Sequence, residues 1–169
     1  PYAQITPEKT PELAGAAKRS INGKLALYEN WEDTGWARSL LILYAARLKD
    51  GEDAYRHLKE LINKLVMENG MVKHPPTRGA AAFDDVYELD GNTGSAAGIL
   101  EMLIQSHNDE IEFLPALPKA WSSGYLKGVR ARGGVTADLF WENGQLLTAV
   151  LTADQAGCRK LKYHGRVRE

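Results

Sequence analysis

In the first hundred residues, apolar positions recur every three or four residues, the spacing of helices with one buried face. Four such stretches predict helices at residues 10–21, 35–48, 53–66 and 93–106. The second and fourth stretches are apolar on nearly every side, which indicates burial between other helices. The third has a single apolar stripe and is typical of a half-exposed helix. Its stripe consists of Tyr55, Leu58, Leu61, Ile62 and Leu65.

Beyond residue 110 the apolar period changes to two, which predicts β-strands. Along residues 135–141, buried positions alternate with outward ones. The pair Asn143-Gly144 then predicts a two-residue hairpin turn into a strand at residues 146–153. Further strands are expected at residues 126–132 and 159–163.

The change of period predicts an α+β chain with two domains. Residues 1–108 form the helical part, and residues 109–169 form a small antiparallel β-domain. Pro115 and Pro118 mark the connection between the two regions.

Charge and composition exclude several classes of function. The 21 basic and 22 acidic residues give a net charge of −1, so there is no electrostatic footprint for nucleic acid or an anionic membrane. No apolar run is long enough to span a bilayer. The single Cys158 excludes an internal disulfide, and no cysteine and histidine spacing suggests a metal site.

The candidate chemistry lies in the glycine-rich segment 87–102, which reads YELDGNTGSAAGILEM. It predicts a turn that leads into an apolar helix, with Asp90 at the helix N-terminus, where free N–H groups and the helix dipole favour a carboxylate. Gly91 would turn the chain with a positive φ, and Gly94 and Gly98 would let the backbone approach a ligand or another helix. Ordinary helix capping by Asp90 or Asn92 explains the same local pattern, and such caps are more common than active sites.

Four stretches in series resemble the family 95 glycoside hydrolases, which are inverting α-L-fucosidases with an (α/α)6 barrel. The run Asp90-Gly91-Asn92 is similar to the start of the family's Asp-Gly-Asn-Phe-Gly signature. The other matching stretches enter a barrel helix, form the family's Gly-Trp-Ser helix, and lead into its C-terminal β-domain. They lie at residues 5–17, 35–51 and 105–134.

The resemblance implies a partial (α/α)6 barrel in which Asp90 is the catalytic base, with Asn92 and His74 contacting the substrate. It places the general acid, a Glu, and the water-positioning asparagines upstream of Pro1. The chain is then the C-terminal fragment of an enzyme and inactive by itself. No metal or other cofactor is needed for this chemistry.

The implied partners are an oligosaccharide substrate and either the missing N-terminal part of the enzyme or a second copy of this chain; no nucleic acid or membrane partner is expected. The family suggests a bacterial protein that is secreted or periplasmic, although the sequence itself does not indicate the compartment.

Departures from the family pattern leave two alternatives open. Thr93 stands where the signature has Phe, and an extra loop at residues 77–86 separates His74 from Asp90. A lone histidine in a proline-rich loop is otherwise usually solvated. One alternative is a glycosidase of the same fold that acts on α-L-galactosides or another sugar, and the other is a non-catalytic structural or interaction domain.

Overall fold

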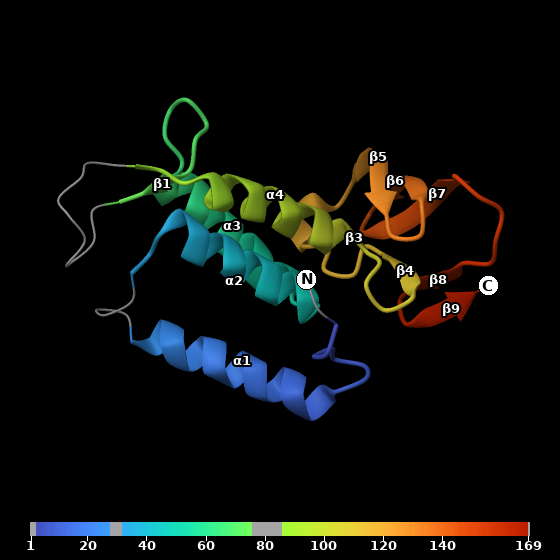
Figure 1. The fold of residues 1–169 in the computed structure, drawn as a ribbon, viewed down its shortest axis with the longest axis horizontal. Helices are drawn as coiled ribbons and strands as arrows, with labels where there is room; N and C mark the ends of the chain where they lie inside the picture. The colour runs from blue at the N-terminus through green and yellow to red at the C-terminus, as the bar shows by residue number, and fades with distance from the viewer. Residues whose placement is uncertain (1–2, 28–31, 76–85, 169) are drawn as a thin grey trace.

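The computed structural model describes residues 3–27, 32–75 and 86–168. The described residues form four α-helices, with two short strands between α3 and α4, and the later strands gather at one end of the helices (Figure 1). The prediction of helices followed by strands is confirmed, and the chain has α+β character. The helices are α1 (Pro11–Ala26), α2 (Gly35–Arg47), α3 (Gly51–Leu65) and α4 (Leu89–Leu103).

The strands form three sheets. Strands β1 (Lys73–His74) and β2 (Val86–Tyr87) pair just before α4. A four-stranded sheet has the order β3-β4-β8-β9, and a three-stranded sheet has the order β5-β6-β7. The strands of these two sheets are β3 (Ile104–Gln105), β4 (Glu110–Phe113), β5 (Gly124–Ala131), β6 (Val135–Glu142), β7 (Gln145–Ala153), β8 (Lys160–Tyr163) and β9 (Arg166–Arg168).

The close packing of α2 against α4 depends on three glycines of α4. A Cβ on Gly91 would lie 3.0 Å from the carbonyl carbon of Gly35, one on Gly94 would lie 2.5 Å from Ser39 Oγ, and one on Gly98 would lie 2.6 Å from Ile42 Cγ2. The prediction that Gly91 turns the chain with a positive φ was wrong, because the whole glycine-rich run is helical and α4 begins at Leu89. The close contact of α2 with α4 that these glycines permit stabilises the fold by more than their weak helix propensity destabilises it.

The buried face of α3 differs from the predicted stripe. Its buried residues include Leu58, Leu61 and Leu65, as expected. His57 is also fully buried, whereas Ile62 is 54% exposed. His57 faces inward because Arg38 of α2 hydrogen-bonds to its ring, a tertiary contact that the apolar pattern of α3 does not reveal.

The three-stranded sheet follows the predicted alternation. The inward residues of β6 are buried, and Asn143 and Gly144 both have the positive φ of a tight hairpin turn. Paired strands are antiparallel, as predicted, except that β4 and β8 run parallel. The chain crosses from one sheet to the other between β7 and β8, which allows this direction. The buried residues of β6 are Val135, Ala137, Leu139 and Trp141.

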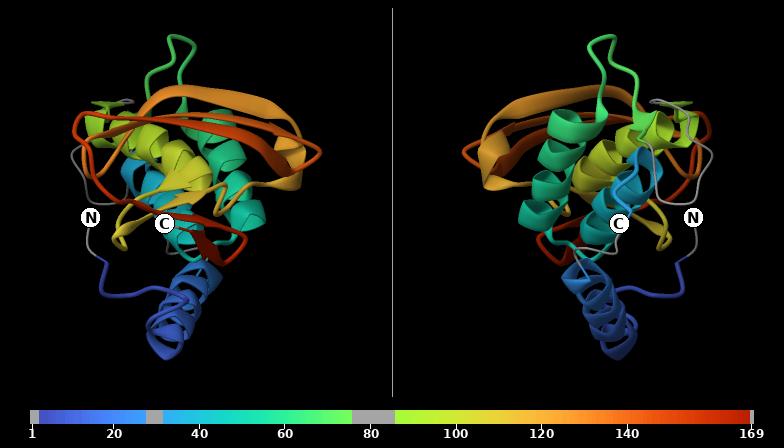
Figure 2. Two further views of the ribbon diagram at one scale, coloured as in Figure 1. Left: turned by 90° about the vertical axis from the view of Figure 1, so that its right-hand side faces the viewer. Right: turned by 90° about the vertical axis from the view of Figure 1, so that its left-hand side faces the viewer.

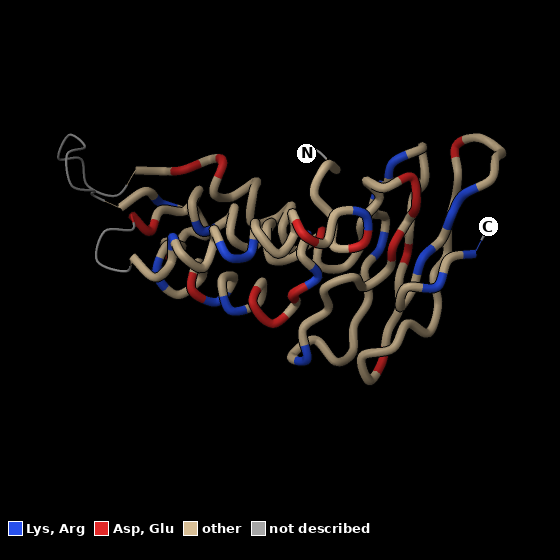
Figure 3. Tube along the Cα trace, turned by 90° about the horizontal axis from the view of Figure 1, so that it is seen from below, with Lys and Arg blue, Asp and Glu red and all other residues tan. Residues whose placement is uncertain are grey.

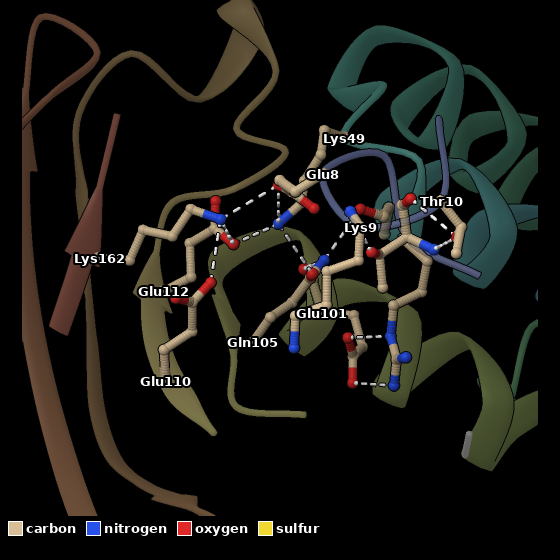
Figure 4. A network of polar contacts seen from close by, with 12 residues as sticks. Glu8, Lys9, Thr10, Lys49, Glu101, Gln105, Glu110, Glu112 and Lys162 are labelled. Carbon is tan, nitrogen blue, oxygen red and sulfur yellow. Dashed lines mark hydrogen bonds and ion pairs between the residues drawn. The ribbon is translucent and has the colours of Figure 1, made fainter. Parts of the chain in front are cut away.

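A charged cluster joins the helical region to the β region (Figure 4). Lys162 of β8 donates hydrogen bonds to Glu110 of β4 at 3.0 Å and to Glu8 at 3.1 Å. Lys49, which follows α2, pairs with Glu112 of β4. Burial opposes the charge of Lys162, but the bonds to Glu110 and Glu8 outweigh burial and raise the pKa of Lys162. The cluster therefore fixes the N-terminal segment, α2 and the sheet against one another.

Helix α1 lies apart from the other three helices in both views of Figure 2. Ala14 is its one buried residue, and Lys18 reaches Asp50, the N-cap of α3, through an ion pair of 2.7 Å. Among the other helices, α3 carries both acidic and basic residues, α2 only basic ones and α4 only acidic ones, and the charged positions are scattered along the tube in Figure 3. Several apolar side chains of α2 and α4 remain exposed. They are Trp36, Tyr44, Leu89 and Leu100.

The (α/α)6 barrel stays a prediction, because the four helices of the described residues cannot close one. The division at residues 108 and 109 into two domains also stays a prediction. Within the described residues, helix ends and strand begins at the junction of Leu103 and Ile104.

The role of the helix-packing glycines can be tested by substitution. Gly98→Ala should lower the free energy of unfolding by about 1–3 kcal/mol, because the new methyl group overlaps Ile42. Gly23→Ala is the matched control, because nothing lies within 4 Å of its added Cβ, and it should stabilise α1 by about 0.5–1 kcal/mol. Urea unfolding of both variants measures the difference, and equal effects would contradict the packing role.

The exposed apolar side chains predict self-association of the isolated chain. Tyr44, 45% exposed on α2, lies on the face where a further helix or a second copy would pack. Tyr44→Glu should therefore shift sedimentation toward the monomer. Leu147→Glu, at a still more exposed position of β7 (64%), is the control and should leave the association unchanged. A wild-type chain that sediments as a monomer at all concentrations would refute the prediction.

Candidate functional site

Asp90 lies in the first turn of α4, exposed to solvent. The helix begins at Leu89, four residues earlier than predicted, so Asp90 is part of the helix and not of a preceding turn. Its Oδ1 accepts a hydrogen bond from the adjacent N–H of Gly91 at 3.0 Å. A carboxylate in this position receives the favourable field of the helix N-terminus while its outer face stays open to a ligand.

Glu88 connects the N-termini of α4 and α2. Its Oε2 accepts a hydrogen bond from the N–H of Trp36 at 2.9 Å, and its own N–H donates to the carbonyl of Val72 at 2.9 Å. Burial raises the pKa of Glu88, and the negative charge of Asp90 raises it further. Sequence reasoning did not single out Glu88. The available signal was that the first turn of the helix starting at Gly35 contains no acidic residue to satisfy its N–H groups.

His74 lies on β1, opposite Val86 of β2, so the short two-stranded sheet brings it beside the start of α4. The ring is half-buried, and its Nδ1 is 2.8 Å from the carbonyl oxygen of Pro75. Val86 is two residues before Glu88, so the pairing of β1 with β2 brings His74 near the start of α4. Most of the predicted extra loop at residues 77–86 lies outside the described residues.

Asn92 binds the backbone of a neighbouring segment at the N-terminal end of α4. Its Oδ1 accepts the N–H of Val72 at 2.7 Å, and its Nδ2 donates to the carbonyl of Gly70 at 3.3 Å. Residues two apart on a helix point to different sides, so the amide of Asn92 is turned away from Asp90. Asn92 thus holds the residue 70–72 segment against α4, while His74, Glu88 and Asp90 gather around the helix N-terminus.

The residues at the start of α4 include a carboxylate that could accept a proton, but they do not include a second group suited to donate one. Asp90 is an open carboxylate, and Glu88 is engaged by the backbone of α2. No group of three or more metal-ligating side chains occurs among the described residues. Likewise, no helix in the described ranges has the length and apolar character needed to cross a membrane.

A second polar group, centred on His57, supports the N-terminus of α2. Arg38 donates from its Nε to Asp33 at 2.9 Å and contacts His57 Nδ1 at 3.0 Å, and Arg56 contacts His57 Nε2 at 3.1 Å. Burial lowers the pKa of His57 to about 4, and the charge of Arg56 adds to the effect. Asp33 directly precedes Thr34, whose side chain caps α2. The contacts of Asp33 with Arg38 therefore fix the backbone at the start of α2.

Comparison with known proteins decides the family. Residues 1–103 match the family model described as Glycosyl hydrolase family 95 catalytic domain, and residues 105–169 match the model for the family's C-terminal domain. The chain belongs to glycoside hydrolase family 95. The part of this family 95 chain matched by the catalytic-domain model contains His74, Glu88 and Asp90.

Two curated relatives illustrate the similarity of the family 95 chain. It is 33% identical to Alpha-L-fucosidase 2 of Arabidopsis thaliana over 98% of its length, and 27% identical to Probable alpha-fucosidase A of Aspergillus oryzae over 87%. It covers 19% of the first protein and 21% of the second. The chain thus spans about a fifth of the length of these relatives.

The buried His57 predicts a pH dependence of stability. Its folded pKa of about 4 lies below the ordinary value of 6.5, so the unfolded chain takes up the proton first as pH falls. The free energy of unfolding of the family 95 chain should drop by about 2–3 kcal/mol between pH 6.5 and 4 because of this group. Urea unfolding across that range measures the slope, and His57→Gln should reduce it. An unchanged slope in the variant would contradict the assignment.

Proposed function

We propose that this chain is the C-terminal part of an inverting glycoside hydrolase that cleaves α-L-fucosides, in which Asp90 is the general base. The single observation that carries the proposal is the open position of Asp90 in the first turn of α4. That turn lies in the part of the chain matched by the family 95 catalytic-domain model. The names of the two curated relatives support a fucoside as the sugar.

Inversion requires two carboxyl groups, one that protonates the leaving oxygen and one that deprotonates the attacking water. Asp90 is suited to the second task, because the helix N-terminus favours its negative charge and solvent reaches it. Glu88 is not suited to the first, because its Oε2 accepts the N–H of Trp36. The resemblance to the family implies that the general acid comes from the remainder of the enzyme, and in this proposal the 169-residue chain alone does not turn over substrate.

The surrounding residues hold the base in place. Glu88 ties the start of α4 to α2, and Asn92 ties it to the residue 70–72 segment. In this proposal His74 contacts the sugar from β1, which pairs with β2 just before α4. Asn92 acts on the substrate indirectly, through the position of the helix. No cofactor takes part in this reaction.

Asp90→Asn tests the proposed base in the full-length enzyme that contains this chain. The variant should lower kcat for an aryl α-L-fucoside by roughly 10²–10⁴-fold, the usual cost of losing a general base. Asparagine also suits a helix N-terminus, so the melting temperature should hardly change. Kinetics and thermal unfolding of the same preparation measure the two effects.

Glu88→Gln is the matched comparison, because glutamine can still accept the N–H of Trp36. It should reduce kcat much less than Asp90→Asn. Normal turnover in Asp90→Asn would leave Asp90 as a helix-terminal residue without a chemical role. An aryl α-L-galactoside, assayed in parallel, distinguishes the alternative sugar, and hydrolysis of neither substrate by the full-length protein would favour a non-catalytic role.

A further inference from the structure

The outward face of the three-stranded sheet carries two aromatic rings side by side. Buried and half-buried residues alternate along β6, so Thr136, Asp138 and Phe140 point away from the core. Tyr125 of β5 is the cross-strand partner of Phe140 and therefore lies on the same face. This sheet lies beyond the C-terminal end of α4, whereas Asp90 lies in the first turn of that helix (Figure 1).

The two rings form a stacked pair that solvent reaches. Their centroids are 6.4 Å apart, and their planes are 29° from parallel, which is the geometry of an offset stack. Tyr125 is 69% exposed, the highest value among the large apolar side chains of the described residues. The pair therefore offers a flat aromatic surface to a ligand.

The side chain of Lys127 restrains both rings. Its Nζ is 5.6 Å from the centroid of the Tyr125 ring and 5.3 Å from that of the Phe140 ring, within the range of cation–π attraction. Within the part of the chain that the structure describes, Lys127 forms no ion pair. Its N–H donors therefore remain available to a ligand that binds at the rings.

Close contacts hold the backbone on both sides of Tyr125. A Cβ on Gly124 would lie 2.4 Å from the ring of Trp141, so only glycine lets β5 approach this buried indole. Beyond Tyr125 a β-bulge interrupts the pairing of β5 with β6, and there Asp138 Oδ1 accepts the N–H of Gly128 at 2.7 Å. The ring pair is therefore held in place before any ligand arrives, which lowers the entropy cost of binding.

Hydrogen-bonding groups flank the rings on the same face. Thr148 of β7 is exposed and is the cross-strand partner of Phe140. Asp138 precedes Phe140 by two residues, and the bond from Gly128 occupies its Oδ1 and leaves Oδ2 for a ligand. Together with Lys127, these residues surround the aromatic pair with a cationic donor, a carboxylate acceptor and a hydroxyl group.

A sugar ring is complementary to this surface. The C–H groups on the face of a pyranose ring carry a small positive charge and pack on the negative face of an aromatic ring. Its hydroxyl groups both donate and accept hydrogen bonds, which matches Lys127, Asp138 and Thr148. An apolar protein partner would bury Lys127 and Asp138 without hydrogen-bond partners, which costs free energy. A polyanion would be repelled by the carboxylate of Asp138.

We propose that the outward face of β5, β6 and β7 is a binding surface for a neutral oligosaccharide. One sugar ring stacks on Tyr125, which Phe140 supports from the neighbouring strand. Lys127, Asp138 and Thr148 bind its hydroxyl groups. The surface retains a glycan without taking part in bond cleavage, so it is separate from the proposed catalytic base and does not depend on it.

Isothermal titration calorimetry of the full-length enzyme that contains this chain tests the surface. The probes are three neutral oligosaccharides with flat rings, namely cellohexaose, mannohexaose and xylohexaose. None of them contains an α-L-fucoside, so the proposed hydrolysis does not consume them. Saturable binding of at least one probe is expected. Binding of none overturns the proposal, including the case in which another part of the enzyme covers the sheet.

Substitutions of Tyr125 test whether the ring carries the binding. Tyr125→Ala should weaken binding of the probe by roughly tenfold or more, because the apolar contact with the sugar ring is lost. Tyr125→Phe keeps the ring and should bind within about threefold of the wild type. Val167→Ala is the control, because Val167 is 48% exposed on β9 of the other sheet, and it should leave the affinity unchanged. Unchanged affinity in Tyr125→Ala, or an equal loss in Val167→Ala, overturns the proposal.

Two further variants keep the test decisive. Thr148→Val removes one hydroxyl group at an exposed position, and it should weaken binding by about two- to tenfold even if Tyr125→Ala does not fold. Unchanged affinity in Thr148→Val overturns the proposal. Asp90→Asn should bind the probe as the wild type does, and loss of binding there would place the probe at the catalytic site and overturn the proposal. A full-length protein that binds the probe but hydrolyses no fucoside would support this surface and contradict only the proposed activity.

Discussion

The close contact between α2 and α4 is the constraint on which the rest of the structure depends. Glycines at positions 91, 94 and 98 remove side chains from one face of α4, so the backbone of this helix meets Gly35, Ser39 and Ile42 of α2 directly. Helices that approach this closely have little freedom to slide, because each side chain of one helix fills a gap in the other. The start of α4, and with it Asp90, is therefore fixed relative to the start of α2.

Hydrogen bonds also fix the position of the start of α4. Glu88 accepts the N–H of Trp36 from α2, and Asn92 holds the residue 70–72 segment. These bonds satisfy backbone groups that would otherwise lack partners at a helix end. Asp90 thus lies on an element that described residues of this chain hold in a fixed position, which is what the proposed role of a general base requires.

At the other end of the helices, a charged cluster adds to apolar packing in determining how the two regions meet. Lys162 and Lys49 lie among Glu8, Glu110 and Glu112, and the side chain of Lys162 is only 8% exposed. Removing one member of such a group leaves another charge buried without compensation, which costs more than the intact group contributes. The cluster therefore specifies one arrangement of sheet and helices.

The amino-acid sequence by itself determined the order of helices and strands, because the period of apolar residues differs between the two regions. It also determined the hairpin at Asn143 and Gly144, since positive φ at both positions is a local preference of these residues. The family followed from motifs read in order along the chain. Tertiary structure decided that Gly91 is helical and that His57 faces inward while Ile62 faces solvent. It also placed Glu88 beside Trp36, 52 residues away in the chain, because these contacts join segments whose approach no local pattern encodes.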